Sequence, residues 1–424
     1  MSRGAAAALV LRAGGMALGG IAAIVLARAL GPAGYGTYSW AFAWVAALAV
    51  PAALGADQLL VREAGIALDR GDGPRLRGLV RSTLRYVVPV SIAAALLVMA
   101  VDVAGGAGPH RSALLLALPI LPLAAVAAVA QGVLLGLGRT ATALAPATVC
   151  RQGAFLVLIV LLSAAGTLSA PGAVALQLAA TAGATLGALV LLRRALGRGS
   201  RLRTVPRGWL RESLPMGASA MFLAIDAQVG LLVLGVTGDA AEAGVFAAAL
   251  QCTAPFVLVI AAGRLPLASA VARLGAADER ERLQRGLRTA TRGVAAVSVA
   301  VAAVFLVAPG LVLDLFGGDF SDGATALRLL VLAHVVNALA AFNGMVLIMR
   351  GRERAAMGAA LGCLVLDGVL CLALVPPLGA TGAAIGLLAS IAVRNVVNSI
   401  QVRRGLGIDA TVIGRMPPGP APTR

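Results

Sequence analysis

Long apolar stretches recur along the whole 424-residue chain, and they constrain its fold more than any other feature. A helix needs about 20 mostly apolar residues to cross about 30 Å of hydrocarbon. Hydrophobic residues make up 60% of the chain and charged residues only 12%, against about 25% charged residues in an average soluble domain. We therefore predict an all-α polytopic membrane protein. About twelve transmembrane helices are expected, at 5–29, 36–56, 83–101, 113–137, 142–163, 172–192, 213–236, 243–267, 290–308, 324–348, 355–375 and 380–401.

The basic residues are all arginines, and they gather in alternate connections between these stretches. Because short basic loops stay in the cytoplasm, the alternation predicts that both termini are cytoplasmic. The stretch 5–29 is interpreted as an uncleaved first helix, since it is longer than the core of a signal peptide. The net charge of +17 belongs to these loops. It does not form the soluble basic face that nucleic acid requires, so no nucleic-acid partner is expected.

The second half of the chain repeats landmarks of the first half. The matching positions are Gly36-Thr37-Tyr38 with Gly244-Val245-Phe246, and Gly138-Arg139 with Gly351-Arg352. Six helices in each half predict two bundles related by a parallel pseudo-two-fold repeat, with the axis along the membrane normal. The expected organisation is an N-terminal bundle at 1–192, a basic cytoplasmic linker at 193–211, a C-terminal bundle at 212–402 and a cytoplasmic tail at 403–424.

Several short stretches resemble a known family in the expected order. They are Ala27 to Tyr38 (ARALGPAGYGTY), Leu54 to Glu63 (LGADQLLVRE), Leu234 to Ala249, and Leu374 to Ala384 (LVPPLGATGAA). The chain is similar to the polysaccharide, or O-antigen, flippases of the multidrug/oligosaccharidyl-lipid/polysaccharide exporter superfamily. The resemblance implies two bundles that form a V, alternating access, and export of an undecaprenyl-diphosphate-linked glycan. It also implies location in a bacterial cytoplasmic (inner) membrane. It also implies membrane lipids as partners, a coupling ion that could be H⁺ or Na⁺, and polysaccharide polymerases as further partners.

Arginines inside the apolar stretches are the first candidates for substrate binding. A charge at the bilayer centre costs about 2.5–3.5 kcal/mol on insertion scales, so such residues usually face a cavity or a partner. Guanidinium groups suit a diphosphate because they stay protonated and donate paired hydrogen bonds. Arg12, Arg151 and Arg394 could line a cationic cavity or could brace the helices. Arg28 and Arg264 lie at helix ends, where snorkelling to the interface competes with binding.

Other polar residues in the apolar stretches are candidates for coupling or for ion pairs. Asp226 and Asp367 could bind a cation or a proton, or could neutralise an arginine. Relatives often carry a basic residue after the first of these acids, whereas Ala227 follows here, so any ion pair of Asp226 needs another partner. His334, Asn337 and Asn343 could form one polar face, or could hydrogen-bond between helices.

Charged residues at the inner end of the second stretch allow two interpretations. Asp57 and Glu63 lie there beside Arg62. They could form a surface ion-pair cluster, or a gate that closes when the cavity faces outward.

We expect a transporter, not an enzyme, that flips a polyprenyl-diphosphate-linked oligosaccharide for cell-surface polysaccharide biosynthesis. No catalytic motif is present, and no metal or cofactor is expected. A cation-coupled multidrug exporter of the same superfamily is the first alternative; it would need a compact acidic site. A membrane-embedded polysaccharide polymerase or ligase is the second; it would need a sizeable external loop, and the expected external loops are short.

Overall fold

The computed structural model describes residues 3–53, 55–104, 110–197, 209–237, 239–273 and 277–414. Those residues form helices and connecting turns, with no strand among them. By internal packing the chain divides into an N-terminal unit, Met1–Gly244, and a C-terminal unit, Val245–Arg424. Nine helices of the described chain are long and apolar enough to cross a membrane, or ten if one bent pair is a single span. The all-α polytopic fold is confirmed, while the count of twelve and the repeat stay predictions.

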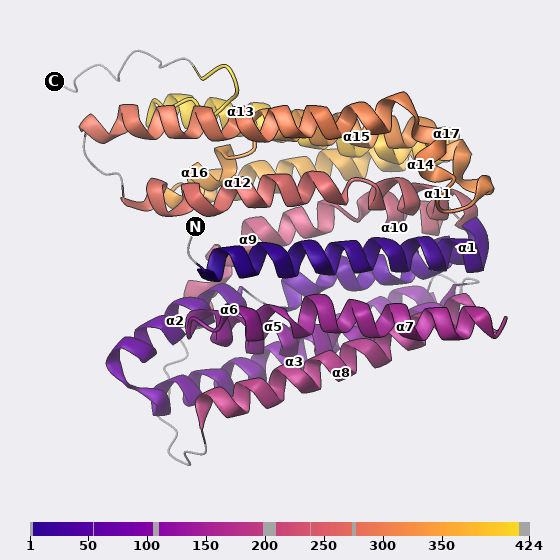
Figure 1. Cartoon of the computed structure of the whole chain (residues 1–424), viewed down its shortest axis with the longest axis horizontal. Helices are drawn as coiled ribbons and strands as arrows, with labels where there is room; N and C mark the ends of the chain where they lie inside the picture. The colour runs from indigo at the N-terminus through magenta and orange to yellow at the C-terminus, as the bar shows by residue number, and fades with distance from the viewer. Residues whose placement is uncertain are drawn as a thin grey trace. The chain divides into compact units, whose positions relative to one another are not determined.

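The N-terminal unit consists of long helices that run side by side (Figure 1). The helices are α1 (Arg3–Ala53), α2 (Ala56–Arg70), α3 (Gly73–Ala104), α4 (Arg111–Ala117), α5 (Ile120–Gly136), α6 (Thr140–Leu144), the π-helical turn η1 (Pro146–Cys150), α7 (Arg151–Ala164), α8 (Ala170–Leu196), α9 (Trp209–Asp226) and α10 (Val229–Val236). α11 (Ala240–Gln251) begins in this unit and ends in the next. α9 packs on α1 and α2, so it belongs to the N-terminal unit.

The C-terminal unit is built around α15, which packs against both α13 and α17. Its helices are α12 (Ala254–Arg273), α13 (Ala277–Val307), α14 (Pro309–Leu313), the 3₁₀ turn η2 (Gly318–Gly323), α15 (Ala324–Leu339), α16 (Asn343–Met349) and α17 (Glu353–Leu406). The predicted boundary, the linker 193–211, lies largely outside the described residues, as does the end of the predicted tail. The predicted domain limits therefore stay predictions.

Two helices are interrupted by a glycine in a conformation that other residues rarely adopt. α1 has 51 residues and α17 has 54, which at 1.5 Å per residue is roughly 75–80 Å, more than twice the hydrocarbon thickness. Gly31 has φ 66° and ψ 178°, and Gly379 has φ 52° and ψ −132°, so each long helix is two helices joined at a kink. A side chain at either position would strain the backbone.

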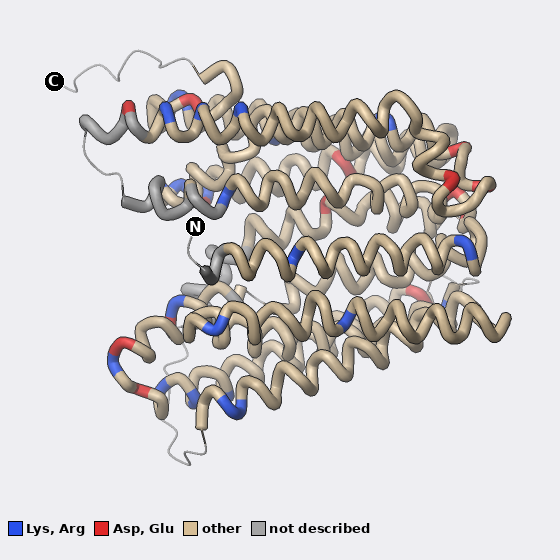
Figure 2. The backbone as a smooth tube through the Cα atoms, viewed as in Figure 1, with Lys and Arg blue, Asp and Glu red and all other residues tan. Residues whose placement is uncertain are grey.

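The arginine-rich connection predicted after 36–56 contains a helix that the sequence analysis missed. α2 is short and amphipathic: Leu59, Leu60 and Ala64 are buried against α3 and α5, while Arg62, Asp69 and Arg70 are exposed. It is too short and too charged to span a membrane. Figure 2 shows the charged residues of both units near helix ends, with few along the middle of the long helices.

Candidate functional site

A cavity of about 250 Å³ lies inside the N-terminal unit. It lies between the second half of α1, α5, α8 and the turn from α6 to α7. Its lining residues are mostly small and apolar: Phe42, Val45, Ala46, Ala49, Ile120, Ala124, Ala127, Ala128, Gln131, Ala143, Pro146, Ala147, Arg151, Thr181, Ala184, Thr185 and Ala188. Arg151 is the one charged residue among the described residues that line it. The small side chains leave the space open, and the guanidinium makes it cationic.

A π-helical turn directly precedes Arg151. The Cys150 N–H donates to Ala145 O at 2.9 Å, five residues back, because the ring of Pro146 cannot continue a regular α-helical ladder. Compared with an uninterrupted α-helix, the extra residue in this turn rotates all of α7 about its axis by about 100°, the angle of one residue in a 3.6-residue turn. The turn therefore determines which way Arg151 faces.

The first half of α1 fixes the position of this turn. A Cβ atom on Gly15 would lie 2.9 Å from Thr148 Cβ, and one on Gly19 would lie 3.1 Å from Gln152 Nε2. At Gly15, whose neighbours are the Cβ and backbone atoms of Thr148, only glycine lets the two helices approach so closely. The spacing of these two glycines thus positions the start of α7 and, with it, Arg151.

A stack of aromatic side chains lies near Arg151 through Tyr38. Tyr38 stacks on Phe42 of its own helix and on Phe155 of α7, with ring centroids 6.2 Å and 6.1 Å apart. The Tyr38 hydroxyl lies close enough to interact electrostatically with Arg151. The one hydrogen bond recorded for Arg151 within the described chain runs from Nε to Ala147 O at 3.2 Å. The terminal nitrogens of the guanidinium are therefore available to a ligand.

Two threonines of α8 add polar atoms to the cavity wall. The Thr181 hydroxyl donates to Gln177 O at 2.8 Å, and the Thr185 hydroxyl lies 2.8 Å from Thr181 O. Because backbone carbonyls take their protons, these hydroxyls face a ligand as acceptors only. The cavity can thus bind an anionic group at Arg151 and hydroxyl groups at the threonines.

The other predicted residues of the N-terminal unit lie outside this cavity. Arg12 and Arg28, both exposed, are not among its lining residues. Asp226 is buried at the end of α9, where the chain bends by 44° into α10. The structure therefore brings one of these four predicted site residues, Arg151, into the cavity.

The C-terminal unit brings three predicted residues together. Arg394 of α17 lies close enough to Arg264 and His334 for its charge to act on both. The His334 ring lies on Phe256, with centroids 5.7 Å apart. Two cationic side chains and an imidazole thus share one region of this unit.

Three asparagines and a serine form hydrogen bonds between α15, α16 and α17. We call them the polar seam (Asn337, Asn343, Asn395 and Ser399). Asn395 Nδ2 donates to Val336 O at 3.3 Å and lies 3.5 Å from Asn337 Oδ1. Asn343 Nδ2 donates to Ser399 Oγ at 2.7 Å. These contacts tie the broken helix α15–α16 to the second half of α17.

Asp367 is fully buried in the first half of α17. Cys371 Sγ donates to its Oδ1 at 3.4 Å. A Cβ atom on Gly386, in the second half of α17, would lie 2.6 Å from the same oxygen. The glycine therefore leaves room for the carboxylate between the two halves of the helix.

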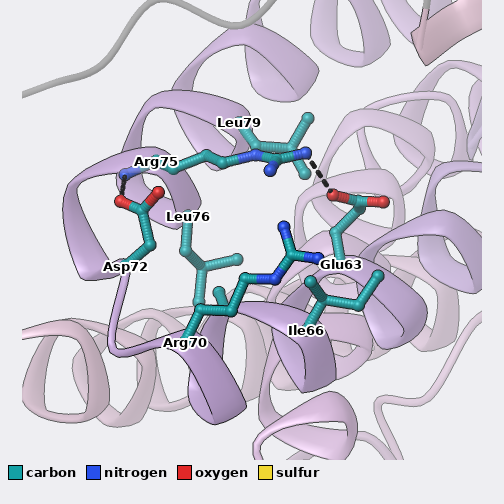
Figure 3. A pocket seen from close by; sticks show the side chains of 8 residues that line it. Glu63, Ile66, Arg70, Asp72, Arg75, Leu76 and Leu79 are labelled. Atoms are coloured by element: carbon teal, nitrogen blue, oxygen red, sulfur yellow. Dashed lines mark hydrogen bonds and ion pairs between the residues drawn. The ribbon is translucent and has the colours of Figure 1, made fainter.

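The charged residues around α2 form an ion-pair cluster (Figure 3). Figure 3 shows Glu63 accepting a hydrogen bond from Arg75 at 3.0 Å, and the Arg75 backbone N–H donating to Asp72 at 3.1 Å. Glu63 also accepts a hydrogen bond from Arg62 at 3.2 Å. The Asp57 side chain lies outside the described residues. The cluster joins the end of α2 to the start of α3, and both arginines are more than 40% exposed.

In the described chain, no group of three or more His, Cys, Asp or Glu side chains could hold a metal ion. The aromatic side chains near Arg151 were not predicted from the sequence. A signal was present, because five of the fifteen aromatic residues fall within residues 35–44.

Three solved structures share the fold of this chain. The inward-facing conformation of a multidrug resistance MATE family transporter of the MOP superfamily aligns with a TM-score of 0.72 at 17% identity, over 91% of this chain and 93% of the other. The MATE multidrug transporter DinF-BH gives 0.69 at 16% identity, over 95% and 94%. A MOP superfamily transporter from Pyrococcus furiosus Vc1, described by a reverse polarity of its binding pocket, gives 0.66 at 18% identity, over 95% of both chains.

No curated protein sequence matches the chain. A family model described as "Polysaccharide biosynthesis protein" matches residues 2–266, which is more than half of the chain. The chain therefore belongs to the polysaccharide biosynthesis protein family and has the fold of MOP-superfamily membrane transporters.

Proposed function

We propose that the protein flips a polyprenyl-diphosphate-linked oligosaccharide across the cytoplasmic membrane of a bacterium by alternating access. The observation that carries the proposal is Arg151, the one charge among the described lining residues of a cavity that also has the ring of Phe42 in its wall. A guanidinium can pair with phosphate oxygens, and aromatic rings offer apolar faces to sugar rings. The family description, polysaccharide biosynthesis, supports the same substrate class.

A cation-coupled multidrug exporter is the competing proposal. Its support is the fold, which the chain shares with proteins described as multidrug transporters. An unpaired guanidinium in a cavity of low dielectric repels a cationic drug and attracts an anion. The pocket polarity therefore favours the glycan, and one structure of the same fold is itself described by a reversed pocket polarity.

Four further predicted residues, two arginines and two acids, have secondary roles in the proposal. Arg264 and Arg394 of the C-terminal unit offer a second cationic position for the diphosphate. Asp226 and Asp367 are the buried acids that could bind a coupling H⁺ or Na⁺. The positive-inside rule favours cytoplasmic termini, and a polysaccharide polymerase would use the exported product.

The test uses the full chain in proteoliposomes loaded with a polyprenyl-diphosphate-linked oligosaccharide, with glycan in the outer leaflet as the readout. Arg151→Ala is expected to slow flipping about 10- to 100-fold, since a hydrogen bond to a charged group contributes about 1.5–3 kcal/mol. Arg151→Lys should retain part of the activity, because charge remains but the paired geometry is lost.

Arg28→Ala is the matched control, because Arg28 lies outside the cavity. Normal glycan flipping by Arg151→Ala at normal protein levels would exclude the cationic cavity as the substrate site. Efflux of a lipophilic cationic dye by the wild type, without flipping of the glycan, would favour the multidrug exporter.

A further inference from the structure

The chain folds back onto the C-terminal unit after α17 ends. It turns at Gly407, which has φ 60°, and residues 408–412 then pack beside α13. We call these five residues the strap. Ile408, Asp409 and Ala410 are each less than 4% exposed. Ile408 and Ala410 belong to the same apolar core as Phe342, just before α16. The strap is therefore part of the interior of this unit.

One face of α13 binds the strap through its backbone. The Gln284 amide accepts from Asp409 N at 2.7 Å and donates to Asp409 O. Two helical turns later, Thr291 Oγ1 lies 3.0 Å from Ala410 O. The next residue, Arg292, donates from Nε to Val412 O at 3.1 Å. These side chains give hydrogen-bond partners to backbone groups of the strap, which buried backbone requires.

The carboxylate of Asp409 fixes the shape of the strap. Its Oδ2 accepts from Arg403 Nη2 at 2.7 Å, and its Oδ1 accepts from the Thr411 N–H at 3.0 Å and from the Thr411 hydroxyl at 2.6 Å. A buried carboxylate is tolerated only when it is paired and hydrogen-bonded in this way. Asp409 thus anchors the strap to the end of α17.

The strap also donates a hydrogen bond to a backbone carbonyl at the break between α15 and α16. α15 ends at Leu339, and beyond it Asn343 N donates to Ala340 O, at 3.2 Å, instead of continuing the four-residue ladder to Leu339 O. The Val412 N–H donates to Leu339 O at 3.0 Å. An orphaned carbonyl at a break inside an apolar bundle costs several kcal/mol if nothing donates to it. The strap supplies the missing donor.

We propose that the face of α13 that carries Gln284, Thr291 and Arg292 is a peptide-binding surface whose ligand is the chain's own strap, and that the bound strap holds the α15–α16 break in place. The polar seam contacts, from Asn337 to Asn395 and from Asn343 to Ser399, flank this break. The strap is thereby a positioning element for the polar seam. This role requires neither a glycan nor transport.

The test is amide hydrogen exchange over residues 336–346 of the detergent-solubilised full chain. Truncation after Gly407 should speed exchange in this region at least tenfold, because the donor to Leu339 and the apolar cover of Phe342 are lost. A synthetic peptide with the strap sequence, Ile-Asp-Ala-Thr-Val, should restore slow exchange. Truncation after Gly414 leaves the strap intact and should exchange like the wild type.

A point variant avoids truncation. Arg403→Ala removes the partner of Asp409 and should speed exchange over the same region. Its neighbour Arg404 is exposed and has no contact recorded in the described chain, so Arg404→Ala is the matched control. Wild-type exchange in both Arg403→Ala and the chain truncated after Gly407 would overturn the proposal. Since no substrate is present, this outcome is independent of the proposed transport function.

Discussion

A Cβ atom on Gly36 would lie 2.7 Å from the backbone nitrogen of Gly244, and one on Gly244 would lie 3.1 Å from the backbone nitrogen of Gly36. These two glycines occupy matching positions in the internal pattern of the sequence. Their contact is reciprocal, since each lies against the backbone of the other. Backbone meets backbone here, so neither position has room for a side chain.

Gly36→Ala is therefore expected to destabilise the protein by about 1–3 kcal/mol, the usual cost of overpacking, although alanine is the better helix former. Thermal unfolding in detergent checks this. Gly20→Ala in the same helix is the control, because a Cβ there meets nothing within 4 Å, and it should leave stability unchanged or raise it. Equal stability of the two variants would contradict the close contact.

The buried carboxylate of Asp367 gives a second test of close packing. Gly386→Ala would place a methyl group 2.6 Å from Asp367 Oδ1 and 2.8 Å from Cys371 Sγ. We expect a loss of about 1–3 kcal/mol. Gly368→Ala on the same helix has open space and serves as the control in the same unfolding experiment. A Gly386→Ala variant as stable as Gly368→Ala would contradict the packing.

Much of the fold could be predicted because membrane spans are strong local signals: long apolar stretches need no tertiary information. α2 was missed because its apolar face is only a few residues wide and its charges resemble those of a loop. Arg151 was predicted as a site residue, but not the direction of its side chain, which depends on the π-helical turn at Pro146. The strap could not be predicted, because its donors and acceptors are backbone groups matched by α13 residues more than 100 positions away.

His110 makes the stability of the protein depend on pH. Thr37 Oγ1 lies 3.0 Å from His110 Nδ1, so the two side chains form a hydrogen bond. Nε2 is buried without a hydrogen-bond partner in the described chain. Burial lowers the pKa of His110 from its ordinary value of 6.5. The folded protein therefore binds this proton less readily than the unfolded chain.

The folded state is favoured most above pH about 6.5, and stability falls as the pH drops from there through the folded pKa, by at most about 1.4 kcal/mol per pH unit. Thermal unfolding of the wild type and His110→Gln between pH 5 and pH 8 isolates this contribution. The wild type should lose more stability than the variant on acidification. Parallel pH profiles of the two proteins would contradict the assignment.

The aromatic side chains beside Arg151 should affect the transport of a glycan more than protein stability. Tyr38→Leu removes the ring between Phe42 and Phe155, while Tyr38→Phe keeps the ring and removes only the hydroxyl. We expect a several-fold loss of glycan flipping for the first variant and near-normal flipping for the second, since a stacked aromatic contact contributes about 0.5–1.5 kcal/mol. Flipping assays in proteoliposomes, at matched protein levels, check this. Equal activity of the two variants would limit the ring to a packing role.

The ion-pair cluster around Glu63 is either a surface contact or a gate, and the two interpretations predict different effects of Glu63→Gln. Arg62 and Arg75 are 46% and 41% exposed, and exposed pairs of this kind contribute at most about 1 kcal/mol, less at high salt. As a surface contact, Glu63→Gln should lower stability by less than about 1 kcal/mol and leave flipping unchanged. A gate predicts the opposite pattern: unchanged stability in detergent with a large change in flipping, because the contact would form in only one state of the transport cycle. Measuring both quantities on the same preparation, at low and high salt, decides between the two, since only the surface contact predicts a salt-sensitive stability together with a constant flipping rate.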